Sequence, residues 1–158
     1  MEQQPGLRFL NAAMPAANLP LLLLASALLL LVSGATQAQE LVVIAHPASG
    51  LVQLSNAEAR HLFLGRYKRL PAGTTAHPID TTQLKERFYA RLVGKPLAEI
   101  DAYWARLVFS GNTRPPEQLP DSAAVVRRVE QTPGAVGYVT RDAVSQHVRI
   151  VLALEAPP

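Results

Sequence analysis

The hydrophobic residues of this chain follow two spacings, one typical of buried strands and one typical of helices. Residues 41–45 (LVVIA) and 148–154 (VRIVLAL) are short and almost wholly apolar. Such runs suit strands that are buried on both faces of a sheet. Between them, apolar residues often recur at every third or fourth position, which places them along one face of a helix. The pattern therefore predicts an α/β fold in which helices cover a sheet.

Residues 80–116 contain two consecutive amphipathic patterns and predict a helical hairpin. The apolar face of the first helix consists of Leu84, Phe88, Tyr89, Leu92 and Val93. The apolar face of the second consists of Leu97, Ile100, Trp104 and Leu107. Gly94 and Pro96 separate the two helices, since glycine commonly follows a helix end and proline suits a first helical turn. We expect the first helix to open at Asp80, with Gln83 as its capping partner.

Two shorter helices and two further strands complete the predicted order. Ser55 and Glu58 have the spacing of a capping box, which begins a helix that Gly65 ends. Asp121 is expected to cap the last helix. Residues 74–80 and 135–139 are interpreted as strands. The predicted fold is a mixed, mostly parallel sheet of about four strands, flanked by about four helices.

The N-terminal region has the pattern of a secretory signal peptide. Residues 21–32 form an apolar run that is too short to span a bilayer comfortably. Thr36 and Ala38 supply the small residues of a cleavage site. We expect residues 1–38 to be removed near Ala38, leaving residues 39–158 as one domain in the periplasm. An uncleaved N-terminal anchor is the alternative.

Composition and charge narrow the classes of partner. The chain has no cysteine, which excludes disulfides and thiolate metal sites. Fifteen Lys and Arg against twelve Asp and Glu give a net charge of +3. The basic residues are scattered and form no aromatic-interleaved patch of the kind that binds nucleic acid. A small anionic ligand or an acidic partner surface suits this mild charge, and so does an ordinary solvated surface.

No motif in the chain predicts catalysis. There is no Gly-x-Ser-x-Gly elbow, no phosphate-cradling glycine-rich loop and no His-Glu-x-x-His. No two histidines have the helical spacing of a metal site, and only His46 and His77 could meet, if their strands are neighbours. We therefore expect a protein without enzymatic activity, cofactor or metal.

Several motifs together resemble a known family. They are Phe63-Leu64-Gly65, Phe88-Tyr89, Trp104, Phe109-x-Gly111 with Pro115-Pro116, and the run from Thr132 to Val139 (TPGAVGYV). This combination resembles the phosphate ABC transporter substrate-binding family, within the type 2 periplasmic binding protein fold. It is most similar to the short members that are exported as stand-alone single lobes. The resemblance covers residues 41–154 and implies a single-lobe, periplasmic-binding-protein-like α/β sandwich.

The resemblance also implies where a ligand would bind. In full-length relatives, a motif of the Arg-Asp/Gly-Ser-Gly-Thr type supplies much of the phosphate site at the start of a helix that follows a strand. Residues 78–83 (PIDTTQ) occupy that place here. The aspartate and two hydroxyls are kept, whereas the arginine, the glycine and the second lobe are missing.

The candidate ligand-binding residues are Ser49, Gly50, Asp80, Thr81 and Thr82. A helix N-terminus presents unpaired N–H groups and a partial positive charge, so an anion is stabilised there. Ser49 and Gly50 follow the first strand, and α/β sheets place ligands at the carboxyl ends of their strands. We expect the five residues to form one cleft edge. Ordinary capping by Asp80, and a plain turn at Ser49 and Gly50, are the structural alternatives.

Two hypotheses of function follow. The first is an exported solute-binding-like domain that takes a small oxyanion, phosphate by resemblance, without catalysis. The alternative is a protein-interaction module of the cell envelope that retains the fold and has lost the ligand. This alternative predicts an exposed apolar or basic patch around residues 63–69.

Overall fold

A five-stranded mixed sheet forms the centre of the computed structural model, which describes residues 39–111 and 113–155. The predicted signal peptide at residues 1–38 lies outside the described residues. The strands are β1 (Leu41–Ala45), β2 (His77–Thr81), β3 (Glu117–Leu119), β4 (Ala135–Thr140) and β5 (Arg149–Leu154). Their order across the sheet is β3-β2-β4-β1-β5.

The strand directions explain where the sheet departs from the sequence prediction. β2 pairs in parallel with both β3 and β4, whereas β1 is antiparallel to both β4 and β5. The mixed α/β class is confirmed, but only half of the pairings are parallel. The additional strand, β3, has the sequence Glu-Gln-Leu. Three residues without an apolar alternation carry no recognisable strand pattern, so only the pairing with β2 reveals this element.

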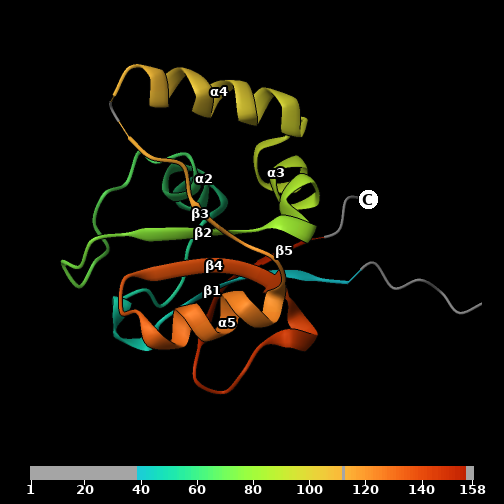
Figure 1. Ribbon diagram of the computed structural model, residues 1–158. Coiled ribbons are helices and arrows are strands. Elements are labelled where there is room, and N and C mark those ends of the chain that lie inside the picture. Colours follow the sequence, from blue (N-terminus) through green and yellow to red (C-terminus); the bar gives the residue numbers. More distant parts are fainter. Residues whose placement is uncertain (1–38, 112, 156–158) are drawn as a thin grey trace, which may run out of the picture. The chain divides into compact units, whose positions relative to one another are not determined.

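Helices cover both faces of the sheet, as Figure 1 shows. α5 (Ser122–Gln131) lies on one face, and α2 (Asn56–Phe63), α3 (Lys85–Val93) and α4 (Leu97–Phe109) lie on the other. Three short 3-10 turns follow strands: η2 (Pro47–Ser49), η3 (Thr82–Leu84) and η4 (Arg141–Ala143). The four predicted helices are thus present.

The apolar run of β1 divides its side chains between two cores. Val42 and Ile44 pack in the cluster that includes Val125 of α5, and Leu41 and Val43 pack in the cluster under α2, α3 and α4. Successive side chains of a strand point to opposite faces, so a strand between two layers is apolar throughout. All five residues of β1 are buried, which confirms the predicted doubly buried strand.

Four aromatic residues form the centre of the larger core. The rings of Phe88 and Tyr138 are stacked with centroids 3.6 Å apart, and Phe63 meets Phe88 edge-on at 4.8 Å. Tyr89 contacts Phe88 at 5.3 Å, and all four side chains are fully buried. This cluster fixes the two tyrosine hydroxyls that reach toward the end of β2.

Two of the predicted helix caps are confirmed, and one predicted helix start is wrong. The capping box is confirmed, since Glu58 N donates to Ser55 Oγ (3.2 Å) and Ser55 N donates to Glu58 Oε2 (2.8 Å). Asp121 caps α5 through Ala124 N (2.8 Å). The predicted helix start at Asp80 is wrong, because Asp80 belongs to β2 and α3 begins only after η3. Pairing with β3 extends β2 through Thr81.

Replacing Gly137 with alanine is expected to lower the free energy of unfolding by about 1–3 kcal/mol. A Cβ atom at this position of β4 would lie 2.4 Å from Val125 Cγ1, which is held in the packed face of α5. Urea denaturation measures the change. The double substitution Gly137→Ala with Val125→Ala should lose less than the sum of the two single losses, because it removes the clash. Strictly additive losses would contradict this packing argument.

Candidate functional site

Three parallel strands end at the same edge of the sheet. The register pairs Thr81 of β2 with Leu119 of β3 and runs β2 alongside β4. η3, α5 and η4 start directly beyond these strand ends, and Thr140 N donates to Ser122 Oγ (3.4 Å) across this edge. Open α/β sheets bind ligands outside the carboxyl ends of their strands. We call this region the carboxyl edge.

The three candidate residues of β2 and η3 differ in exposure. Asp80 and Thr81 are 1% and 0% exposed. The Thr81 hydroxyl donates to the Tyr138 carbonyl, so the sheet itself uses this group. Thr82 begins η3 and is exposed. Of these three side chains, Thr82 is therefore the one that solvent can reach.

Ser49 and Gly50 lie at the opposite edge. β1 is antiparallel to β4, with Ala45 opposite Val136, so the carboxyl end of β1 meets the amino end of β4. Ser49 is buried and its Oγ accepts a hydrogen bond from Leu51 N (3.2 Å). The structure thus brings Asp80, Thr81 and Thr82 together and separates them from Ser49 and Gly50. The expectation of a single cleft edge is corrected, because it assumed that β1 runs parallel to β2.

Asp80 is the centre of a buried polar network that the sequence did not reveal. Its Oδ1 accepts hydrogen bonds from the hydroxyls of Tyr89 (3.0 Å) and Tyr138 (3.3 Å). Lys85 Nζ lies 3.8 Å from Oδ2. Burial raises the pKa of Asp80 to about 6, against the opposing effects of Lys85 and the two hydroxyls. The signal available in the sequence was that buried tyrosines normally find a hydrogen-bond partner.

Burial also raises the pKa of both tyrosines above the ordinary value. They therefore remain neutral hydrogen-bond donors across the physiological range. Asp80 can bind a proton, but the side chains around its carboxyl group separate it from solvent. The observable role of the network is to fix α3 and β4 around the end of β2.

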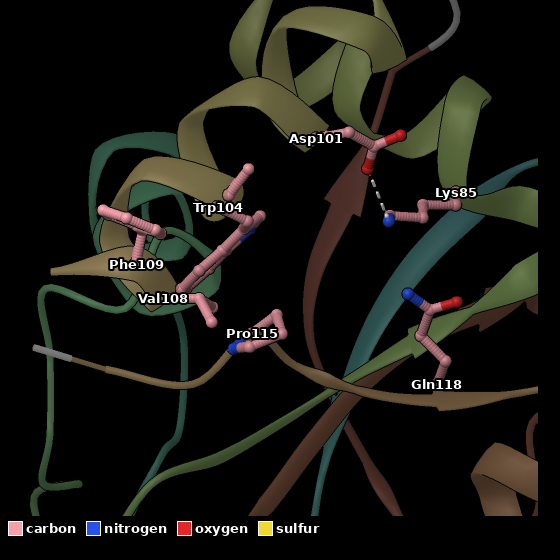
Figure 2. Close-up of a pocket in the computed structure, with 8 residues that line it drawn as sticks. Lys85, Asp101, Trp104, Val108, Phe109, Pro115 and Gln118 are labelled. Atoms are coloured by element: carbon pink, nitrogen blue, oxygen red, sulfur yellow. Dashed lines mark hydrogen bonds and ion pairs between the residues drawn. The ribbon is translucent and has the colours of Figure 1, made fainter. Parts of the chain in front are cut away.

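A pocket of about 390 Å³ lies beside this network, between α3, α4 and β3 (Figure 2). Its lining consists of Lys85, Asp101, Trp104, Ala105, Val108, Phe109, Pro115 and Gln118. Lys85 Nζ lies 3.0 Å from Asp101 Oδ1, and the pair marks the polar end of the pocket. Two carboxylates therefore offset the charge of Lys85. The apolar wall makes this pocket better suited to an apolar group than to an anion.

One ion pair lies at the carboxyl edge. Arg141, directly after β4, meets Glu40 through Nε–Oε2 (2.5 Å) and Nη2–Oε1 (2.9 Å) contacts. The hydrogen bonds from Arg141 lower the pKa of Glu40 below its usual value. Neutral donors such as the Thr82 hydroxyl remain for a ligand at this edge.

The remaining observations concern the predicted surface patch, metal-ligating side chains and membrane-spanning helices. Phe63 is fully buried, so the predicted patch at residues 63–69 is corrected to residues 66–69, which are exposed. Within residues 39–111 and 113–155, no group of three or more metal-ligating side chains is suitably placed for an ion. None of the described helices has the length and apolar character needed to cross a membrane.

Comparison with family models and with curated proteins gave no match. Solved structures with a similar fold include one from Vibrio cholerae and one from Clostridium perfringens. An ABC-type phosphate transport receptor from Vibrio cholerae aligns with a TM-score of 0.56 and 10% identity, covering 71% of this chain and 45% of the receptor. A putative phosphate ABC transporter substrate-binding protein with bound phosphate from Clostridium perfringens aligns with a TM-score of 0.54 and 13% identity, covering 71% and 44%.

The chain spans less than half the length of each of these two proteins. The similarity confirms the α/β class and shows that the chain shares its fold with part of each of these two proteins.

Proposed function

We propose that this chain is an exported binding domain that holds a small oxyanion at the carboxyl edge and does no chemistry on it. The observation that carries the proposal is the meeting of three parallel strand ends at one edge, where the Thr82 hydroxyl is exposed. Phosphate is the first candidate, since one of the two similar proteins is a phosphate transport receptor and the other has bound phosphate. Export through a signal peptide cleaved near Ala38, and residence in the periplasm, belong to the same proposal.

The proposed anion site depends on uncharged hydrogen-bond donors. The first residues of a helix leave backbone N–H groups without intrahelical partners, and these groups favour an anion. The Thr82 hydroxyl adds a donor at the start of η3, where the chain turns from β2 into α3. Asp121 already occupies one N–H group at the start of α5, so the start of η3 is the better anion site.

Calorimetry of the purified chain with phosphate, sulfate and a neutral sugar tests the proposal. We expect heat with an anion and none with the sugar. Thr82→Ala should weaken anion binding about ten- to hundredfold, since a hydrogen bond to a charged group contributes roughly 1.5–3 kcal/mol.

Thr75→Ala is the matched control for this experiment. It removes the same hydroxyl from an exposed residue just before the amino end of β2, and should leave the affinity unchanged. Absence of heat with every anion up to millimolar concentration would contradict the proposed binding of an oxyanion.

A protein-interaction module of the cell envelope is the second candidate. It is favoured by the apolar surface at the end of α4, where Phe109 is 97% exposed and Val108 is half exposed beside the pocket of Figure 2. Clustered apolar side chains in contact with water commonly mark a binding surface. Under this second candidate function, the domain binds a partner protein and no solute.

A further inference from the structure

A tight turn after α2 brings together basic residues that are separated in the sequence. Gly65 adopts a left-handed conformation (φ 72°), its N–H donates to Leu62 O (3.1 Å), and Arg66 N donates to His61 O (2.8 Å). This paired hydrogen-bond pattern is the Schellman motif, which reverses the chain at a helix end. Arg66 is thereby placed beside Arg60 and His61, which are in the last turn of α2.

These residues line a basic pocket of about 230 Å³, completed by Ala57 and Leu64. Within the described residues, neither Arg60 nor Arg66 forms an ion pair. The sequence from 59 to 79 contains no acidic residue, while Lys68 and Arg69 add positive charge. Glu58, the nearest acid before it, is held by Ser55 in the capping box. Arg60, Arg66, Lys68 and Arg69 against the single carboxylate of Glu58 leave this surface with a net positive charge.

An apolar hollow of about 280 Å³ adjoins the basic pocket. It is lined by Leu51, Leu54, Glu58, Leu62, Tyr67, Arg69, Leu70 and Pro71. Tyr67, which is 44% exposed, lines the hollow, and its ring centroid lies 5.3 Å from that of His61 in the basic pocket. The two depressions thus share a boundary formed by α2 and Tyr67.

We propose that the basic pocket and the apolar hollow together dock an acidic segment of a partner protein. A carboxylate would lie between Arg60 and Arg66, because guanidinium groups bind carboxylates through two parallel hydrogen bonds. An apolar side chain of the same segment would pack against Tyr67. The charge of the surface selects an acidic partner, and arginine and tyrosine are enriched among the residues that dominate binding energies.

This inference rests on the second candidate function and is independent of oxyanion binding at the carboxyl edge. Arg60, Arg66 and Tyr67 belong to α2 and the loop after it, whereas Thr82 follows β2. Thr82→Ala should therefore leave docking unchanged, so failure of one proposal does not decide the other.

Fluorescence anisotropy of the full chain with a labelled peptide of alternating Asp and Leu tests the inference. We expect saturable binding that weakens as salt is raised, and no binding of the same peptide with Asn in place of Asp. Charge reversal at both arginines (Arg60→Glu with Arg66→Glu) should weaken binding roughly tenfold or more. Tyr67→Ala should also weaken it while keeping the salt dependence.

The matched control reverses two exposed arginines elsewhere, Arg106 on α4 and Arg127 on α5, and changes the net charge equally. It should leave the affinity within about twofold, since screening limits the effect of distant charges. Equal losses in both double variants would overturn the inference, as would equal binding of the Asn peptide or failure of the acidic peptide to bind.

Two further outcomes would also overturn it. One is a lower melting temperature in the Arg60 and Arg66 variant without any change in peptide affinity. These cations would then serve only to offset the negative end of the α2 dipole. The other is arginine-dependent binding to anionic phosphatidylglycerol vesicles in place of the peptide.

Discussion

Replacing Phe88 with alanine is expected to lower the free energy of unfolding by about 3–5 kcal/mol, the usual cost of truncating a buried phenylalanine. The ring is fully buried and makes contacts on several sides, stacking on Tyr138 and meeting Phe63 and Tyr89 edge-on. Its neighbours come from α2, α3 and β4, so no single element can move to fill the cavity. Urea denaturation followed by circular dichroism measures the loss.

Phe109→Ala is the matched control for this prediction. It removes the same ring from α4, where the side chain is 97% exposed. The free energy of unfolding should change by no more than about 0.5 kcal/mol. Similar losses at the two positions would show that the stacked aromatic cluster is not the centre of the core.

The contribution of Asp80 to the stability of the protein is expected to fall as pH rises from about 4 to about 7. In the unfolded chain its pKa is near the ordinary value of 3.8, and in the folded protein burial raises the pKa to about 6. Between these values the folded state binds more protons than the unfolded state, so the free energy of unfolding decreases with pH. Raising the pKa from 3.8 to about 6 corresponds to roughly 3 kcal/mol. The contribution is complete below about pH 4 and lost above about pH 7.

Asp80→Asn isolates this effect. Asparagine keeps an oxygen that accepts from the Tyr89 and Tyr138 hydroxyls but carries no charge. We expect the variant to be more stable than the wild-type chain at pH 8, with the Asp80-dependent slope gone. Urea denaturation at a series of pH values checks both statements. Asp142→Asn, at an exposed carboxylate, should keep the wild-type slope, and parallel curves for wild type and Asp80→Asn would contradict the assignment.

Much of the fold could be predicted because it depends on local chemistry. The capping box at Ser55 needs only residues within one helical turn, and the apolar run of β1 reports burial on both faces directly. The amphipathic patterns of α3 and α4 identify the faces that are buried. The combination of short motifs was specific enough to indicate the fold.

The candidate site could be predicted only in part, because it depends on strand direction. An apolar run has the same pattern whichever way its strand points, so the sequence did not reveal that β1 is antiparallel to β4. That direction places Ser49 and Gly50 at the edge away from Thr82. The short strand β3, which extends β2 and turns Asp80 from a predicted cap into a buried strand residue, was equally hidden.

By itself, then, the sequence determined most of the buried apolar residues, where most helices begin and end, and the α/β class. These properties follow from the spacing of apolar residues and from caps a few residues long. Tertiary structure alone decided which strand ends meet, which hydroxyl stays exposed, and which groups surround Asp80. Each of these depends on contacts between residues far apart in the chain, such as Asp80 with Tyr138 and Thr81 with Leu119.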